Sequence, residues 1–226
     1  MINSSLVTTS KFPLQPSTDK ELWLVFDIET NGLFDDVTDT FCVVCHDLIN
    51  NQTHKFKPDQ VNQALKLLSK ADVLIGHNIL FYDLPVLNKL YKITFSARII
   101  DTLVCTRLIW PKEVLYDLDD ELYQQVPIAL KGSASLKAWG YRLSNHKIDF
   151  KDFSEYSQEM LDYCVQDVMV TCNLLKYIIK QNYSQPALKL EHEFAIFIQK
   201  QIREGIPFDI DAALDLVDVL RTKQTR

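Results

Sequence analysis

Four carboxylates stand out because each interrupts a segment that otherwise has the composition of a protein core. Asp27 and Glu29 lie in LWLVFDIET, Asp83 in IGHNILFYDLP and Asp167 in YCVQDV. An isolated buried carboxylate is costly, so it normally changes its protonation state, finds a partner or binds a metal ion. The same segments contain no comparable set of lysines or arginines, which suggests divalent cations as the partners. If the four acids converge, they form a metal-dependent centre for phosphoryl transfer.

Asp27 and Glu29 are two residues apart in an expected strand, so their side chains point to the same face of the sheet. Two ionised carboxylates about 4 Å apart repel each other by roughly 4 kcal/mol at an effective dielectric constant of about 20. A shared cation removes that repulsion. The alternative is that the strand ends at Asp27 and that both acids are solvated loop residues.

Asp167 lies in an expected long helix, where it belongs neither to the main apolar stripe nor to the polar strip. It shares its sector of the helix with Met160, Val170, Leu174 and Ile178, which places an acid on a second apolar face. A helix that is apolar on two faces is expected to be buried on both. A capped or hydrogen-bonded structural aspartate is the alternative interpretation.

Asp83 falls in the first turn of an expected helix, where the helix dipole by itself favours an acid. Asn78, five residues earlier, is an ordinary residue for the end of a strand. Both positions therefore have a structural explanation that competes with a role in metal or substrate binding.

The hydrophobic pattern defines the elements that must position these acids. It predicts strands at residues 22–28, 41–48, 53–56, 71–76 and 98–100. It predicts helices at 59–70, 81–91, 101–110, from Ser133 or Ser135 to Tyr141, at 155–181, at 186–204 and from Ile206 to the end. Residues 116–127 are acidic, and we expect them to form an irregular, solvated loop. Strands followed by helices interleaved with strands predict an α/β fold with a mixed sheet of about five strands.

The composition is that of a globular protein, with 226 residues, 47% of them hydrophobic and 24% charged. A net charge of −6 disfavours a broad basic surface for duplex DNA, although bound metals would reverse the charge locally. No signal peptide or long apolar run is recognisable, so we expect a cytoplasmic protein without a membrane partner. The spacing of Cys42, Cys45 and His46 resembles a c-type haem attachment, but core thiols in a buried strand are the favoured interpretation.

The segments DIETNGL, HNILFYD and YCVQD resemble, in this order, the three motifs of the DEDD superfamily of 3′–5′ exonucleases, which have a ribonuclease-H-like fold. The third segment has the Tyr-x-x-x-Asp form of the tyrosine subclass, which includes the proofreading domains of family A DNA polymerases. Over roughly residues 22–226 the chain is most similar to the exonuclease domain of short-tailed T-odd phage polymerases. IDTLVCTRLI, SLKAWGYRL, YCVQDVMVT and QIREGIPFD match segments of those enzymes in the same order.

This resemblance implies a role for each acid. Asp27 matches the carboxylate that bridges two metal ions, and Asp83 matches the acid that holds the second ion. Glu29 and Asp167 match ligands of the first ion, with Glu29 also helping to place the attacking water. Tyr163 matches the tyrosine that hydrogen-bonds this water. Because its reference pKa is near 10, we assign it to orienting the water rather than to acting as a base.

The implied cofactors are two divalent ions, Mg²⁺ or Mn²⁺. Two ions about 3.5–4 Å apart stabilise the attacking and leaving oxygens of an in-line displacement. The third motif contains no histidine, which disfavours the histidine subclass of the superfamily.

Substrate contacts are implied at three further positions. Leu33 matches an apolar residue that wedges against the terminal base, and Thr30 and Asn78 match residues near the scissile nucleotide. The spacing from Asn78 to Asp83 is that of the phage branch.

A basic stretch at residues 131–151 contains Lys137 and Arg142, with Trp139 and Tyr141 interleaved. These residues are candidates for guiding a single strand through phosphate contacts and stacking. The alternative is a solvated helix and loop with Trp139 in the core.

The expected organisation is a flexible tail at residues 1–19, an exonuclease domain at 20–185 and a helical junction at 186–226 that resembles the start of a polymerase region. No polymerase domain follows in the sequence, so no polymerase activity is expected.

The expected function is a 3′–5′ exonuclease that releases nucleoside 5′-monophosphates from DNA 3′ ends, in proofreading or in phage DNA replication or degradation. The alternatives are an exoribonuclease of the same superfamily and a polymerase-docking subunit that binds the 3′ end. The expected partners are single-stranded DNA or a frayed 3′ end, and a separate DNA polymerase subunit. A phage-encoded chain would act in the host cytoplasm.

Overall fold

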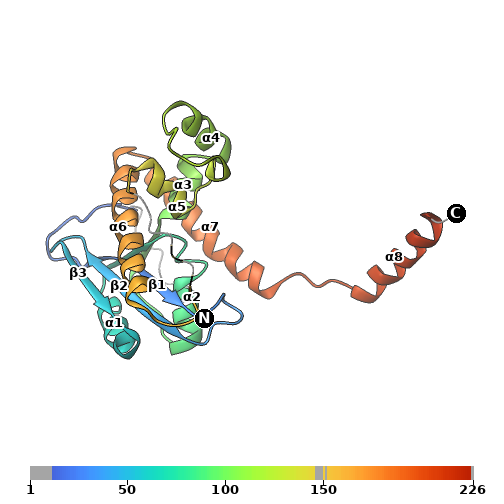
Figure 1. The fold of residues 1–226 in the computed structure, drawn as a ribbon, viewed down its shortest axis with the longest axis horizontal. Helices are drawn as coiled ribbons and strands as arrows, with labels where there is room; N and C mark the ends of the chain where they lie inside the picture. Colours follow the sequence, from blue (N-terminus) through green and yellow to red (C-terminus); the bar gives the residue numbers. More distant parts are fainter. Residues whose placement is uncertain (1–11, 146–149, 151, 225–226) are drawn as a thin grey trace.

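A mixed five-stranded sheet forms the centre of the computed structural model, which describes residues 12–145, 150 and 152–224 (Figure 1). The strand order is β3-β2-β1-β4-β5. The pairs β1–β2 and β2–β3 are antiparallel, whereas β1–β4 and β4–β5 are parallel, as expected for a mixed sheet. The strands are β1 (Trp23–Thr30), β2 (Thr40–Asp47), β3 (Gln52–Phe56), β4 (Val73–Gly76) and β5 (Arg98–Asp101).

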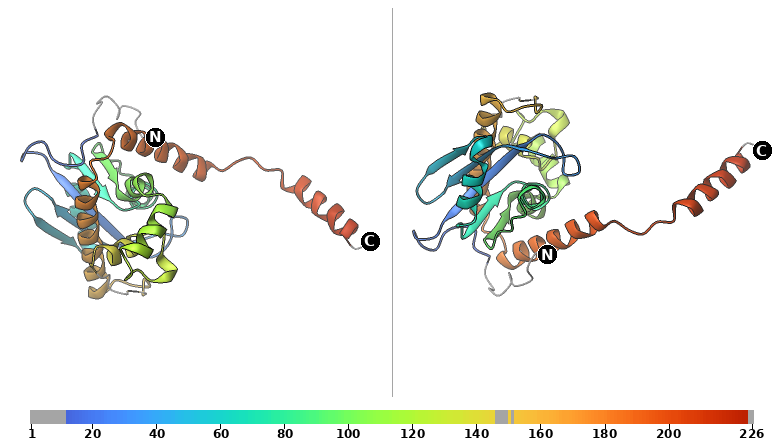
Figure 2. Two further views of the ribbon diagram at one scale, coloured as in Figure 1. Left: turned by 90° about the horizontal axis from the view of Figure 1, so that it is seen from above. Right: turned by 90° about the horizontal axis from the view of Figure 1, so that it is seen from below.

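Helices cover both faces of this sheet, as the views from above and below show (Figure 2). The long helix α6 crosses one face over β1 and β2, while α1 and α2 pack on the other face. The helices are α1 (Val61–Leu68), α2 (Asp83–Tyr91), α3 (Thr102–Ile109), α4 (Lys112–Glu121), α5 (Leu136–Arg142), α6 (Gln158–Lys180), α7 (Gln185–Glu204) and α8 (Ile210–Gln224), with short 3₁₀ turns at Pro58–Gln60 and Ile128–Leu130.

Each sheet face has its own apolar cluster, because successive side chains of a strand point to opposite sides. Val25 and Cys42 belong to the cluster under α6, whereas Phe26 and Cys45 belong to the cluster under α1 and α2. Both cysteines are fully buried and lie on opposite faces of β2. They are core thiols, as favoured from the sequence, and cannot act together as a haem or redox pair.

One expected loop is a helix. The acidic segment at 116–127 was expected to be irregular, but α4 extends to Glu121, and only the remainder lacks an α-helix. Asp119 is fully buried rather than solvated, because it pairs with Arg142 from α5. Local charge density could not reveal this contact, since the partner lies 23 residues further along the chain.

The expected flexible tail also needs correction. Residues 1–11 lie outside the described part of the chain, but Phe12 and Leu14 are buried in the cluster under α6. The ring of Phe12 packs on His192 of α7, with ring centroids 4.6 Å apart. At least this end of the segment is therefore part of the folded body.

Helix α7 packs on α3 through one face, which buries Leu188, His192, Ala195 and Gln199. His192 Nε2 accepts a hydrogen bond from the backbone N–H of Asp101 at 2.9 Å, so its Nδ1 carries the proton and donates to Leu188 O at 2.7 Å. Beyond α7 the chain extends away from the body, and α8 has no buried residue (Figures 1 and 2).

His192 should make stability depend on pH. Burial lowers its pKa from 6.5 to about 4, so between these values the unfolded chain binds a proton that the folded chain excludes. Its stabilising contribution is complete above pH 6.5 and is lost as the pH falls toward 4. Over this range we expect the free energy of unfolding of the wild type to fall about 3 kcal/mol more than that of His192→Gln.

The measurement is urea unfolding at several pH values, with His54→Gln in β3 as the control for replacing a histidine elsewhere. Parallel stability curves for the wild type and His192→Gln would contradict the expectation.

Candidate active site

The carboxyl end of β1 carries the first two acids. Asp27 and Glu29 lie opposite Val44 and Cys42 of β2, so they share the sheet face that α6 covers. Asp27 is partly exposed, whereas Glu29 is buried. Ligand atoms of Asp27, Glu29 and Cys164 all lie within 4.8 Å of one another. The two acids are thus strand residues that project onto one face, as the alternation predicted, and are not solvated loop residues.

The parallel pairing of β1 ends before these acids. The pairing of β1 with β4 stops at Val25 and Ile75, while β1 continues to Thr30. Gly76 ends β4 in close contact with β1, since a Cβ atom there would lie 2.9 Å from Phe26 O. The backbone then turns toward α2, which carries the third acid.

Asp83 approaches β1 from the first turn of α2. Its carboxylate lies near the backbone N–H of Ile28, the residue between Asp27 and Glu29, which partly opposes the rise in the pKa of Asp83. The side chain is buried, and its Oδ1 has no hydrogen-bond partner among the described residues. Burial, with a further contribution from the charge of Asp101, raises the pKa of Asp83 to about 7. An oxygen atom with these properties fits a cation ligand.

Helix α6 contributes the fourth acid. The Cys164 thiol contacts Asp27, with its Sγ 3.5 Å from the backbone O and 3.6 Å from Oδ2. Asp167 lies three residues further along the same helix and is also buried. Tyr163, one turn before Asp167, is half-buried, and its ring packs against Phe150 and Phe153 at centroid distances of 5.7 and 6.1 Å.

The four acids therefore lie on three elements, β1, α2 and α6. Asp27 and Glu29 lie on β1, Asp83 contacts the backbone between them, and Asp167 follows the α6 residue that contacts Asp27. Carboxylate oxygens in this number suit a hard divalent cation such as Mg²⁺ or Mn²⁺. The group of possible ligand atoms at Asp27 and Glu29 nevertheless also contains Cys164, which was not predicted from the sequence.

The turn after β1 is held by Tyr82. Its hydroxyl donates to Gly32 O at 2.6 Å and makes a short contact with the Thr30 hydroxyl, which also lies 3.1 Å from Gly32 O. Leu33, at the edge of this turn, is 76% exposed and accessible to a ligand. Sequence reasoning missed Tyr82, although its position directly before Asp83 was an available signal.

Asp101 holds the loop between β4 and α2. Its Oδ1 accepts the N–H of Asn78 at 2.9 Å, and its Oδ2 accepts the N–H of Leu80 at 3.0 Å. Asn78 has a positive φ of 72°, a conformation that asparagine tolerates better than most residues. Asp101 was also missed, although an acid between a strand and a helix was a recognisable N-cap signal.

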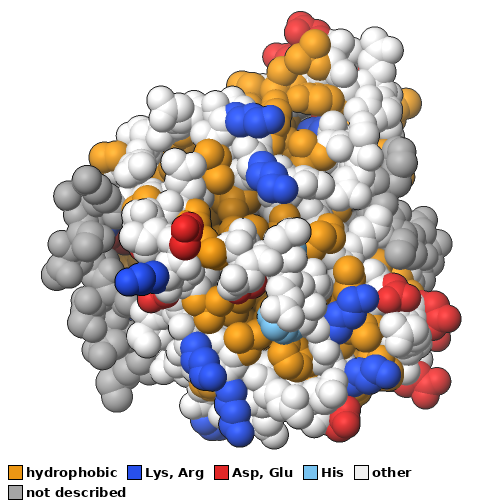
Figure 3. Space-filling view, turned by 90° about the vertical axis from the view of Figure 1, so that its left-hand side faces the viewer, with side chains coloured by type: hydrophobic (Ala, Val, Ile, Leu, Met, Phe, Trp, Pro, Cys, Tyr) orange, Lys and Arg blue, Asp and Glu red, His pale blue; other side chains and the backbone are white. Residues whose placement is uncertain are grey.

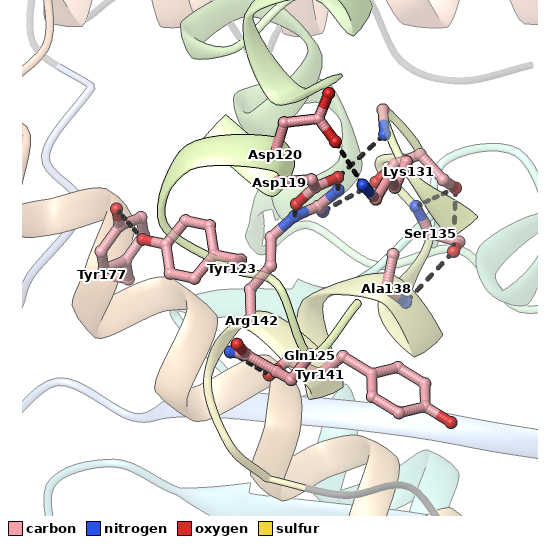
Figure 4. A network of polar contacts seen from close by, with 12 residues as sticks. Asp119, Asp120, Tyr123, Gln125, Lys131, Ser135, Ala138, Tyr141, Arg142 and Tyr177 are labelled. Atoms are coloured by element: carbon pink, nitrogen blue, oxygen red, sulfur yellow. Dashed lines mark hydrogen bonds and ion pairs between the residues drawn. The ribbon is translucent and has the colours of Figure 1, made fainter. Parts of the chain in front are cut away.

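The expected role of Arg142 in phosphate binding is wrong. Its side chain is fully buried, and it donates to Asp119 through Nε at 2.7 Å and Nη2 at 2.8 Å (Figure 4). Nη1 donates to Ser133 O at 2.7 Å, and the guanidinium lies over the Trp139 ring. Each guanidinium nitrogen is thus used inside the protein. Trp139 is likewise a core residue, as the alternative interpretation had it.

The remaining basic residues of this stretch have different environments. Lys137 is half-buried on α5, and Lys131 forms an ion pair with Asp120. Lys147 and Lys151 lie outside the described residues. On the face drawn in Figure 3, lysine and arginine side chains are scattered rather than merged into one basic surface.

A cavity of about 450 Å³ opens beside Asn78. Arg107 and Lys112 contribute cationic side chains to its wall, and Ser133 and Ser135 contribute hydroxyl groups. The sequence analysis selected neither Arg107 nor Lys112, because their helices join the wall only in the folded chain.

A family model described as the RNase H superfamily matches residues 24–179. The chain belongs to the ribonuclease H superfamily. The predicted ribonuclease-H-like fold is thereby confirmed, as is the resemblance to the exonuclease domain of T-odd phage polymerases, which rests on the following relatives.

The DNA-directed DNA polymerase of Enterobacteria phage T3 is 31% identical over 89% of this chain and 36% of its own length. The DNA-directed DNA polymerase of Escherichia phage T7 is 30% identical with the same coverage. The chain therefore spans about a third of the length of these relatives.

Solved structures support the fold alone. The structure of Brucella melitensis NrnC with bound Mg²⁺ has a TM-score of 0.54 and 16% identity, covering 86% of this chain and 92% of that chain. The structure of the same protein bound to pGG has a TM-score of 0.51 and 16% identity, covering 86% and 91%.

Among the described residues, no helix is both long enough and apolar enough to span a membrane.

Asp83 should destabilise the metal-free ribonuclease H fold at alkaline pH, because its ionised carboxylate is buried. We expect Asp83→Asn to raise the melting temperature at pH 8 in EDTA by roughly 2–8 °C, equivalent to about 1–2 kcal/mol. We also expect it to reduce the stabilisation that Mn²⁺ gives to the wild type. Thermal melts with and without Mn²⁺ measure both effects.

The exposed acid Asp162 of α6 provides the control, since Asp162→Asn should leave both melts unchanged. A lower melting temperature for Asp83→Asn in EDTA would contradict a destabilising Asp83 carboxylate.

Proposed function

We propose that this chain is a metal-dependent 3′–5′ exonuclease that removes nucleoside 5′-monophosphates from DNA 3′ ends. The observation that carries the proposal is the pair Asp27 and Glu29 on one face of β1, together with the buried acids Asp83 on α2 and Asp167 on α6. Such a set is costly unless its members take up protons or bind cations, and bound cations compensate several acids at once. DNA is favoured as the substrate because the two phage relatives are DNA polymerases.

In this proposal, Asp27, Glu29, Asp83 and Asp167 hold two divalent ions, Mg²⁺ or Mn²⁺. When bound, the ions supply positive charge for the scissile phosphate and make water more acidic. The protein itself limits the exposure of the site, since only Asp27 among the four acids is more than slightly exposed.

Tyr163 orients the attacking water through its hydroxyl group, while Phe150 and Phe153 hold its ring in place. The water attacks phosphorus, and the 3′ oxygen of the preceding nucleotide leaves. A residue that orients without accepting the proton is consistent with a phenol, whose ordinary pKa is near 10.

The substrate strand reaches this site past the turn after β1. The exposed Leu33 packs against the terminal base, while Thr30 and Asn78 lie near the nucleotide that is cleaved. Lys137 and the cavity beside Asn78, with Arg107 and its neighbours, receive the phosphates of the preceding nucleotides.

The nuclease proposal predicts a chelation-sensitive reaction. Labelled single-stranded DNA should be shortened from its 3′ end with Mg²⁺ or Mn²⁺ present, and the activity of Asp27→Ala/Glu29→Ala should fall by at least about 10²-fold because the charge that holds the ions is removed. Asp162→Asn, an exposed acid on α6, should retain full activity.

RNA of the same sequence distinguishes the exoribonuclease alternative, which requires faster cleavage of RNA than of DNA. Intact DNA and RNA with either metal would overturn the nuclease proposal. Normal circular dichroism of the double variant separates a lost site from a lost fold.

A second role, docking to a DNA polymerase, is favoured by the outer face of α7 and by α8. Beyond the packed face of α7, large apolar side chains remain exposed: Leu190, Phe194, Phe197, Ile202, Ile206, Phe208, Ile210, Leu214, Leu216 and Leu220. We propose that a polymerase subunit covers this surface, because the relatives that share this segment are DNA polymerases of greater length. The complex would act in the cytoplasm of the host cell.

The docking surface can be changed without disturbing the packed side of α7. We expect Phe194→Asp/Phe197→Asp to abolish co-elution with a DNA polymerase from the same source in gel filtration, because it places two charges on the apolar surface. Lys189→Asp/Lys200→Asp is the matched control on the same helix. Equal co-elution of both double variants with the wild type would contradict docking through this surface.

A further inference from the structure

The thiol of Cys164 lies beside the acids Asp27 and Glu29. A site for a hard cation such as Mg²⁺ needs only oxygen ligands, so this sulfur is not explained by such a site. Its Sγ is 3.6 Å from Asp27 Oδ2, although the two residues are 137 positions apart in the chain. The thiol of Cys42 on the neighbouring strand β2 lies nearby and contributes to raising the pKa of Cys164. Cys164 is fully buried and therefore fixed between β1, β2 and α6.

The spacing of these atoms suits a small tetrahedral site. With bonds of about 2.0–2.3 Å, the ligand atoms of a tetrahedral zinc ion lie roughly 3.5 Å apart. The Cys164 Sγ and Asp27 Oδ2 atoms are at this spacing, and one ligand atom of Glu29 lies within 4.8 Å of both residues' ligand atoms. Shortening the distances to Glu29 from at most 4.8 Å to about 3.5 Å would bring all three ligand atoms around one ion.

A second observation points to a cation in the same place. Asp83 reaches the backbone between Asp27 and Glu29, and its buried Oδ1 has no hydrogen-bond partner in the described chain. This oxygen would gain a partner, directly or through water, from an ion held by the other two acids.

We propose that Asp27, Glu29 and Cys164 form a site for one thiophilic divalent cation of the Zn²⁺ or Cd²⁺ class. Thiolate ligands select such ions, whereas carboxylates alone suit Mg²⁺ or Mn²⁺. As the metal–sulfur bond forms, the Cys164 thiol loses its proton to water, and no electron transfer is involved. The hydrogen bond from this thiol to Asp27 is replaced by shared coordination of the ion.

The site overlaps the nuclease centre, because Asp27 and Glu29 belong to both. An ion held by sulfur would exclude the harder ions that the reaction needs, so this chain would be inhibited by traces of Zn²⁺ or Cd²⁺. The inhibition rests on the proposed nuclease function, whereas the binding of the ion does not.

The decisive experiment measures Cd²⁺ binding by the full chain, without substrate. Titration should produce the ultraviolet charge-transfer absorption of a cadmium–thiolate bond, saturating at one ion per chain. Cys164→Ala should lose this absorption and bind Cd²⁺ with an affinity lowered by 10- to 100-fold or more, since loss of a direct ligand costs at least as much as loss of an outer-shell contact.

Cys172→Ala removes another buried thiol from α6, away from the acids, and should bind Cd²⁺ as the wild type does. Cys164→Ser replaces the thiol with a hydroxyl of similar size, so loss of the absorption in a folded Cys164→Ser variant excludes a folding artefact. Equal absorption and affinity in Cys164→Ala and the wild type would overturn the proposal.

Nuclease assays separate the two proposals. The Zn²⁺ concentration that inhibits the Mg²⁺-supported nuclease activity should be lower for Cys172→Ala, which keeps the Cys164 thiol. It should be higher for whatever activity Cys164→Ser retains. A wild-type chain that gives the cadmium–thiolate absorption but cleaves no DNA or RNA would retain the sulfur site and lose the nuclease function. A wild-type chain that cleaves DNA or RNA but gives no cadmium–thiolate absorption would retain the nuclease function and overturn the sulfur site.

Discussion

The burial of carboxylates without a protein cation beside them is the constraint on which the rest of this structure depends. Asp27 and Glu29 project from one face of β1, and Asp83 lies near the same strand, where burial raises its pKa to about 7. Their proximity is unfavourable without cations, and only tight packing on both sides of the sheet maintains it. The apolar clusters under α6 and under α1 and α2 supply that packing.

The loop that carries Asn78 depends on elements far from it in sequence. Asp101 accepts two backbone N–H groups of this loop, and the backbone of Asp101 itself is held by His192 on α7. The position of α7 is thus linked by two consecutive hydrogen-bonded contacts to the segment that leads into Asp83. A partner on the outer face of α7 would bind close to a structural support of the candidate site.

Two buried acids, Asp119 and Asp83, differ in whether a cationic side chain lies beside them. Asp119 is buried, as Asp83 is, but Arg142 neutralises it through two hydrogen bonds. This pair joins α4 and α5, and Asp119 is therefore not a candidate cation ligand. Asp83 has no cationic partner among the described residues, and its Oδ1 is left without a hydrogen bond there. A buried acid is thus a candidate ligand only where no protein cation compensates it.

The sequence by itself determined the strand pattern, the same-face geometry of Asp27 and Glu29, and the order of the acidic motifs, because these follow from local periodicity and residue type. It also identified Asp167 as an acid on an apolar helix face. Only the tertiary structure decided that Cys164 contacts Asp27, that Asp83 reaches Ile28 and that Arg142 is withdrawn from the surface. These are contacts between segments far apart in the sequence. The residues that flank a side chain in the sequence do not specify which distant residue it contacts in the folded chain.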